Sequence, residues 1–270
     1  MQVTEILTDH TLMALELRGA PEYPIRFYLD IMDQFDRAGI HWHWHPELEF
    51  NVITRGTMEY YVENEHHTLT AGQGIFKNAN ILHMAQPASH TPDAEMFSVI
   101  MDAAFLAPPQ SVIYQKYVAP FLGSQGLRSL CLSPQVPWQR QMLDLLRQSY
   151  ALSQTETGAY ELHIHRLMCQ VWQAIAEHAQ QLPRHDLTAA QRTDQVRAKQ
   201  MIAFLQCQSA NSGSSIGMNG LQCQTLHGTV FRRHDQIRIL TEFSRQKHSR
   251  HFFIRLQRQY VDNCGASGCA

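Results

Sequence analysis

The sequence predicts an α+β protein in three parts: a β-barrel or sandwich over residues 1–130, a helical segment over 131–185 and an all-α region over 186–270. Three observations support this prediction. Short strand-like runs, punctuated by Gly or Asn, recur up to about residue 105. Apolar residues then follow a helical period, and the excess of basic over acidic residues is confined to the C-terminal part.

The composition is that of a folded protein. The 270 residues are 44% apolar and 17% charged, which argues against extended disorder. The N-terminus lacks the pattern of a secretory signal, and no apolar run is long enough to span a membrane. The six cysteines include no C-x-x-C pair, so no structural zinc knuckle is expected. We therefore expect a cytoplasmic protein with no membrane partner.

The strand-like runs dominate the first part of the chain. They cover residues 48–53, 57–62, 67–69, 75–76 and 95–101. Arg55-Gly56 is a turn signal between the first two runs. Many short strands at this spacing are typical of a barrel or a sandwich.

Two helices are predicted after Pro134. Their apolar stripes are Trp138, Met142, Leu145 and Leu146, and then Tyr160, Ile164, Leu167, Met168, Val171, Trp172 and Ile175. Such a helical pair packs on the barrel, against a second copy of itself, or both. We expect a homodimer that depends on the stripe Ile164, Leu167, Met168, Val171, Trp172 and Ile175.

Charge divides the chain into unequal halves. Residues 1–190 carry 11 basic and 20 acidic residues, whereas residues 191–270 carry 11 basic and 4 acidic ones. The C-terminal part thus has a net charge of +7, which favours contact with a polyanion. A basic tail that only balances an acidic core is the plainer alternative.

Histidine and glutamate side chains, which can bind a metal or a polar ligand, are most concentrated in residues 41–49, with the sequence HWHWHPELE. On a strand, His43 and His45 point to one face, and Glu49 follows four residues later. With His83 further along the chain, these groups either converge on a divalent transition metal or line a polar pocket for a small ligand. No cofactor is expected if the second alternative holds.

The spacing of these residues resembles the two motifs of cupin barrels. His43-x-His45-x3-Glu49-x6-Gly56 matches the first motif, and the run from Gly72 to His83 resembles the second. The resemblance implies a cupin-like barrel, or double-stranded β-helix, over roughly residues 15–105. Asn78 and Asn80 stand where metal-binding cupins usually have Pro and Gly. This departure favours an effector pocket formed by His43, His45, Glu49 and His83 over a metal site.

Several longer sequence segments resemble segments of AraC/XylS-type transcription regulators. They lie at residues 24–28, 41–49, 74–80, 113–117 and 197–205, and the similarity covers residues 20–206. It implies that the barrel binds a small effector, often a sugar or a related metabolite. It also implies that the helices dimerise and that helix-turn-helix units bind duplex DNA.

The C-terminal third departs from this family pattern. Residues 208–220 are rich in Ser, Asn and Gly and show no helical period. Residues 231–260 are strongly basic, and by comparison with the family we expect the second recognition helix to be missing. We expect a remnant of a helix-turn-helix domain, incomplete or degraded. Its candidate DNA-binding residues are Arg232, Arg233, Arg238, Arg245 and Lys247.

The function predicted from the sequence is therefore AraC-type regulation of transcription, without enzymatic activity. In this interpretation an effector in the barrel modulates DNA binding by the C-terminal helices. Two alternatives remain open. One is a metal-dependent cupin enzyme, such as a dioxygenase or an isomerase. The other is a sensor or dimerisation module that has lost DNA binding.

Overall fold

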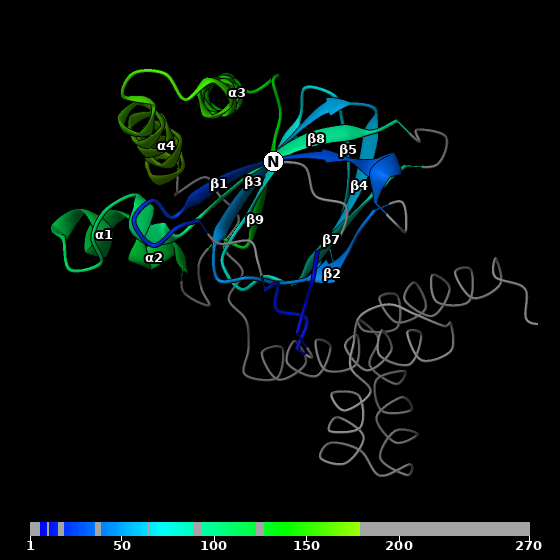
Figure 1. Cartoon of the computed structure of the whole chain (residues 1–270), viewed down its shortest axis with the longest axis horizontal. Coiled ribbons are helices and arrows are strands. Elements are labelled where there is room, and N and C mark those ends of the chain that lie inside the picture. Colours follow the sequence, from blue (N-terminus) through cyan, green and yellow to red (C-terminus); the bar gives the residue numbers. More distant parts are fainter. Residues whose placement is uncertain are drawn as a thin grey trace, which may run out of the picture. The chain divides into compact units, whose positions relative to one another are not determined.

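A computed structural model describes residues 6–178, apart from 10, 16–18, 36–38, 64, 89–92 and 123–126. These residues belong to one compact unit of the chain. Their fold class is the expected one, α+β with an N-terminal β-barrel followed by helices (Figure 1). The predicted helix-turn-helix region, residues 186–270, lies outside the described residues, as do its five candidate DNA-binding side chains.

Two antiparallel sheets form the barrel (Figure 1). The first sheet contains, in spatial order, β1 (Ile25–Ile31), β8 (Glu95–Met101), β3 (Leu48–Arg55), β6 (Gly74–Lys77) and β9 (Ser129–Leu132). The second contains β2 (Ile40–His43), β7 (His83–Pro87), β4 (Thr57–Val62) and β5 (Glu65–Thr70). Sequence-remote strands are therefore neighbours, so that β3 pairs with both β6 and β8.

Strand β3 shows how the barrel separates its two faces. Leu48, Phe50 and Val52 alternate with Glu49 and Asn51, and all five are buried. The apolar residues join the cluster that packs against the helices outside the barrel. The polar residues therefore point to the opposite side, the barrel interior, because side chains alternate along a strand.

A tight turn joins β3 to β4 at the predicted position. Gly56 has φ +76°, in the left-handed region that glycine enters without strain. A Cβ at this position would lie 2.9 Å from the Cα of Ala94. The turn signal in the sequence thus marks a position where both the backbone conformation and the available space favour glycine.

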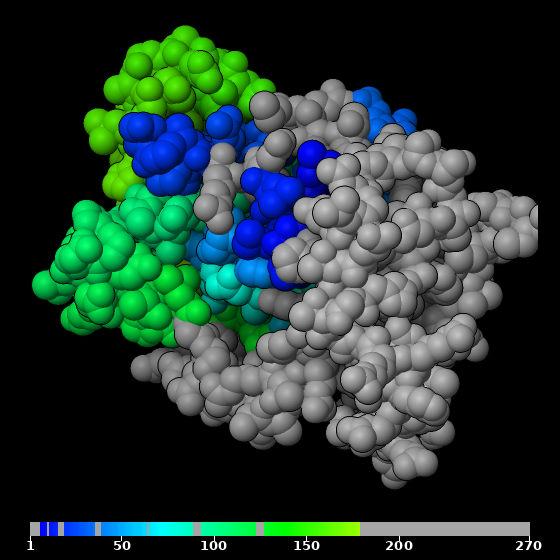
Figure 2. Space-filling model, turned by 60° about the horizontal axis from the view of Figure 1, so that its bottom comes forward, coloured from blue at the N-terminus to red at the C-terminus, as the bar shows by residue number. Residues whose placement is uncertain are grey.

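Helices cover the outer face of the first sheet. They are α1 (Val112–Tyr117), α2 (Ala119–Leu122), α3 (Pro137–Thr155) and α4 (Tyr160–Glu177), with 3-10 turns at Met32–Gln34 and Ala103–Phe105. In Figure 2 the α3–α4 pair and the α1–α2 pair form two green bulges on one side of the barrel. No helix in the described part of the chain is both long and apolar enough to cross a membrane.

The apolar stripe of α4 corrects one expectation. Its six residues, Ile164, Leu167, Met168, Val171, Trp172 and Ile175, are buried within the chain itself. Trp172, for example, packs edge-on against Phe76 of β6, with ring centroids 6.0 Å apart. The stripe is therefore not a free dimer surface. Sequence periodicity identified the buried face of the helix but not the surface that buries it.

The barrel also extends further than the strand rhythm predicted. Strand β9 follows α1 and α2, yet it pairs with β6 over four residues, with Phe76 opposite Leu130. The sheet thus continues to Leu132, beyond the strand-like runs that end near residue 105 and as far as the predicted boundary of the barrel part at residue 130. A four-residue apolar run between helices carries too little periodicity to reveal this pairing.

A polar cluster inside the barrel

The four candidate site residues come together inside the barrel. His43 ends β2, His45 lies in the connection to β3, Glu49 belongs to β3, and His83 begins β7. One ligand atom from each residue lies within 4.8 Å of the others, and all four residues are buried. The structure thus places the predicted residues in one cluster, while their role in ligand binding remains a prediction.

The reason for this convergence differs from the one the sequence suggested. The strand ends at His43, so His43 and His45 do not face one side through simple alternation along a strand. The pairing of β2 with β7 shifts register between Ile40 and His43. Because of this irregularity Ile40 and His43 both line the pocket, whereas His41 is exposed.

Three nitrogen atoms surround a single oxygen of Glu49. Its Oε2 lies 2.9 Å from Lys77 Nζ, 3.0 Å from His45 Nε2 and 3.0 Å from His83 Nε2. Its Oε1 accepts a hydrogen bond of 2.9 Å from the side-chain amide of Asn51. Burial alone would raise the pKa of Glu49, but Lys77 and the imidazoles hold it well below its usual value. Glu49 is therefore a carboxylate at neutral pH.

Lys77 is a member of this cluster that the sequence analysis missed. It is the direct cross-strand partner of Glu49, and only 2% of its side chain is exposed. Its ammonium also lies 5.3 Å from the centre of the Tyr60 ring. The sequence did contain an indication that Lys77 is buried. Residues two apart on a strand share a face, and Ile75, two residues before Lys77, is buried.

The imidazoles of His43 and His83 are held in one tautomer. Nδ1 of His43 lies 2.7 Å from the carbonyl of His41, and Nδ1 of His83 lies 2.8 Å from the carbonyl of Ile81. A carbonyl only accepts, so each Nδ1 carries the proton and each Nε2 is an acceptor. Burial lowers the pKa of His83 to about 4 and that of His43 well below its usual value, so both rings are neutral.

His45 has a different environment. Its Nε2 faces Glu49 at 3.0 Å, and its Nδ1 faces Glu47 Oε2 at 3.4 Å. Burial would lower the pKa of this histidine, but the two carboxylates outweigh burial and raise it. The cluster therefore combines two neutral imidazoles with a third whose pKa is raised.

A second polar group lies across the pocket. Ser98 on β8 donates to the carboxyl group of Asp30 on β1 and accepts a 2.7 Å hydrogen bond from Asn51. Since Asn51 also donates to Glu49, a continuous network joins Asp30 to the histidine cluster. Burial raises the pKa of Asp30 to about 7, although its hydrogen bond to Ser98 opposes the rise. Sequence reasoning missed these residues because they belong to remote strands.

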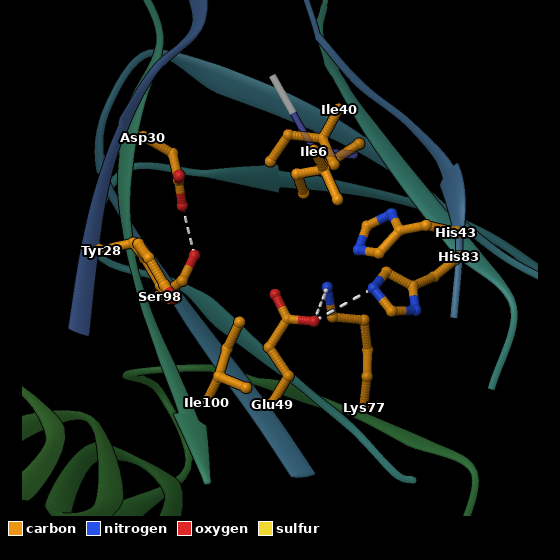
Figure 3. Close-up of a pocket in the computed structure, with 11 residues that line it drawn as sticks. Ile6, Tyr28, Asp30, Ile40, His43, Glu49, Lys77, His83, Ser98 and Ile100 are labelled. Atoms are coloured by element: carbon orange, nitrogen blue, oxygen red, sulfur yellow. Dashed lines mark hydrogen bonds and ion pairs between the residues drawn. The ribbon is translucent and has the colours of Figure 1, made fainter. Parts of the chain in front are cut away.

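These groups surround a pocket with apolar walls (Figure 3). Lys77 and Glu49 point toward one another, with the His43 and His83 rings beside them and Asp30 on the far side. The cavity itself has a volume of about 20 Å³, which is room for about one water molecule, so an organic ligand requires the walls to move apart. The apolar lining consists of Ile6, Tyr28, Ile40, Ala85 and Ile100. A few polar groups within apolar walls are typical of a small-molecule site.

The two asparagines that depart from the cupin motif have structural roles. Asn78 is buried, and its side-chain amide donates to the carbonyls of Phe121 and Leu127, which ties β6 to the segment around the short helices. Asn80 has φ +65°, a left-handed conformation that Asn adopts more readily than most residues. Its N–H donates to the carbonyl of His45 and so holds the connection that carries this imidazole.

The donor set has the composition of a transition-metal site, but Lys77 conflicts with a metal there. Three imidazoles and a carboxylate suit zinc or iron, and backbone acceptors on Nδ1 are usual for metal-binding histidines. The ammonium of Lys77, however, contacts the carboxylate oxygen that a metal would need. A divalent ion about 4 Å from an ammonium would be repelled by roughly 8 kcal/mol at an effective dielectric constant of about 20. The residues present therefore do not fit a metal while Lys77 is charged.

The barrel with its enclosed polar pocket defines a ligand-binding domain of the cupin type, joined to a helical extension. The family of AraC-like ligand binding domains matches residues 31–168, half of the chain. The chain belongs to this family.

A curated relative extends the similarity beyond the barrel. The chain is 25% identical over 197 residues to the uncharacterised HTH-type transcriptional regulator YdeC of Bacillus subtilis (strain 168). The match covers 73% of this chain and 66% of the relative, just under two thirds of its length. The chain is thus similar to an HTH-type transcriptional regulator over most of its length.

Solved structures give only local matches. KdgF from Halomonas sp. matches 23% of this chain and 56% of its own, with 19% identity and a TM-score of 0.21. Oxalate decarboxylase OxdC of Bacillus subtilis matches 23% of this chain and 17% of its own, with 21% identity and a TM-score of 0.21. TM-scores this low give no information about function.

Proposed function

We propose that this protein is a cytoplasmic transcription regulator whose barrel binds a small polar effector and thereby modulates DNA binding by residues 186–270. Family membership and the similarity to a transcription regulator support a ligand-sensing regulator. The effector, the modulation of DNA binding and the absence of enzymatic activity are parts of the proposal.

The observation that carries the proposal is the buried polar network around the pocket. Asp30, Asn51, Glu49 and Lys77 are all buried, and burying polar and charged groups costs stability even when they are paired. One buried acceptor in this network, Asn51 Oδ1, has no hydrogen-bond partner among the described residues. We infer that a small polar effector supplies hydrogen-bond partners to the polar groups that line the pocket.

A physical route connects the pocket to the helices. On β6, Lys77 points into the pocket, while the preceding residue, Phe76, packs against Trp172 of α4 on the outer face. An effector that contacts Lys77 would displace β6 and change the packing of α4, which leads into the rest of the chain. Such an effector changes operator affinity only if it binds the two arrangements differently.

The effector is tested on the full-length protein with a metabolite library that includes sugars and polyols. We expect at least one compound to raise the thermal midpoint and to bind with 1:1 stoichiometry in calorimetry. His43→Ala should weaken this binding at least tenfold, whereas His41→Ala, on the exposed side of the same strand, should leave it unchanged. Equal binding by the two variants would place the ligand outside the barrel.

DNA binding is tested by fluorescence anisotropy on the protein's own upstream region and on scrambled DNA. The net charge of +7 after residue 190 predicts attraction that weakens steeply with salt. We expect this protein to discriminate poorly between DNA sequences. We also expect its affinity for DNA to change tenfold when the effector is added. A preference of a hundredfold or more for the upstream region at physiological salt would show that the C-terminal third is an intact, sequence-specific DNA-binding domain.

A homodimer is also part of the proposal, with its interface outside the buried stripe of α4. Sedimentation velocity on the full chain tests it directly. A monomer at all concentrations up to 100-fold above that of the DNA experiments would refute this part alone.

A further inference from the structure

We propose that Lys77 is the residue that keeps the histidine–carboxylate cluster free of metal, so that its replacement by a neutral side chain would turn the pocket into a transition-metal site. The side-chain ammonium supplies the positive charge that a metal ion would otherwise bring to Glu49. Lys77 is thus a residue that determines ligand specificity. The argument needs three steps.

The position of the ammonium is fixed by the sheet. Glu49 on β3 and Lys77 on β6 are direct cross-strand partners, and the distance from Nζ to Oε2 is 2.9 Å. The side chain of Lys77 is only 2% exposed, so its ammonium lies against the carboxylate inside the barrel. The Tyr60 ring, 5.3 Å from Nζ, gives the cation a further favourable contact.

The remaining donors are already arranged for a cation. His43 and His83 donate through Nδ1 to backbone carbonyls and present an unprotonated Nε2 to the pocket. The Nε2 atom of His83 lies 3.0 Å from Glu49 Oε2, so this imidazole and the carboxylate already face one point inside the barrel. The ammonium of Lys77, 2.9 Å from the same oxygen, supplies the positive charge at that point.

Removing the charge therefore leaves a complete donor set without its cation. Methionine has nearly the length of lysine and carries no charge. In Lys77→Met the carboxylate of Glu49 loses its ammonium partner, and the three imidazoles remain. A divalent ion then gains the carboxylate and the imidazole lone pairs without repulsion from a neighbouring ammonium.

The test is a titration of full-length protein with Co²⁺, because its visible spectrum reports the number and type of ligands. We expect Lys77→Met to bind one Co²⁺ at least 100-fold more tightly than the wild type, with a d–d spectrum of nitrogen and oxygen ligands. Lys116→Met, which removes an exposed lysine, and Lys77→Arg, which keeps the charge, should behave like the wild type. Adding His83→Ala to Lys77→Met should abolish the gain.

Two results would overturn the proposal. One is a wild-type protein that retains stoichiometric Co²⁺ or Zn²⁺ after dialysis and loses it on His83→Ala alone. The other is a folded Lys77→Met protein whose affinity equals that of the wild type. If Lys77→Met fails to fold, as circular dichroism would reveal, Lys77→Gln replaces it. The metal content of the wild type and of His83→Ala after dialysis tests the first result whether or not the Lys77 variants fold.

Discussion

The two faces of strand β3 are equally buried but are built from opposite chemistry. Leu48, Phe50 and Val52 point outward into an apolar cluster that includes the buried sides of α3 and α4. Glu49 and Asn51 point inward, where every favourable interaction depends on one or two polar partners. The outer face spreads its stabilisation over many weak contacts, whereas the inner face concentrates it in a few strong ones. Single substitutions should therefore act differently on the two faces.

The largest loss is expected from Glu49→Gln on the inner face. The variant keeps the shape of the side chain but leaves the buried Lys77 ammonium without its counter-charge. Breaking a buried ion pair in this way costs about 3–5 kcal/mol of unfolding free energy. Urea denaturation measures the loss, with Glu22→Gln on the surface as the matched control. Combining Glu49→Gln with Lys77→Met should recover most of it, and a strictly additive double variant would contradict the coupling.

Asp30, also on the inner side, should give the protein a pH-dependent stability. Its pKa rises from 3.8 to about 7 in the folded state, so the folded protein binds the proton more tightly than the unfolded chain. Stability should therefore fall as pH rises from about 4 to about 7, by about 4 kcal/mol from this group.

The measurement compares wild type with Asp30→Asn by chemical denaturation between pH 5 and pH 8. The asparagine variant should lack this fall, so that its stability relative to wild type increases with pH. Asp33→Asn, an exposed neighbour, should follow the wild-type curve. Parallel curves for all three proteins would mean that Asp30 titrates normally.

The outer side is tested by Leu167→Ala on α4. Leu167 is 1% exposed within the apolar cluster, and the truncation leaves a cavity. We expect a loss of about 3 kcal/mol. Leu162 lies on the same helix and is 67% exposed, so Leu162→Ala should change stability by less than about 0.5 kcal/mol. Similar losses for both would show that the helix packs differently. Sedimentation of Leu167→Ala should match that of the wild type, because the residue is buried within the chain.

The smallest effect is expected in the connection from β6 to β7, which joins the two sheets. Asn80 has φ +65° and donates its N–H to the carbonyl of His45. Alanine in this left-handed conformation costs about 1 kcal/mol, whereas glycine adopts it freely. Asn80→Ala should therefore lower the free energy of unfolding by about 1 kcal/mol and Asn80→Gly by less than about 0.5 kcal/mol. If Asn80→Gly lowered the free energy of unfolding more than Asn80→Ala does, the contribution of Asn80 would come from its side chain and not from its backbone conformation.

Local patterns predicted those parts of the molecule that depend on neighbouring residues. The alternation in residues 48–53 and the turn at Arg55-Gly56 are strand and turn as expected. The helical periods after Pro134 correspond to α3 and α4. The motif spacing also identified His43, His45, Glu49 and His83, which the barrel brings together. Each of these predictions used residues within one element or one recurring motif.

The sequence by itself determined which apolar residues of the main strands and helices are buried, because the periods of the two structures are local properties of the chain. It did not determine what buries them. Only the tertiary structure decided that the α4 stripe packs on the barrel rather than on a second copy. The same holds for the pairing of Lys77 with Glu49 and of Ser98 with Asp30, which depends on the register of strands remote in sequence. Lysine and aspartate are usually exposed, and only this register gives each of them a partner that makes burial tolerable.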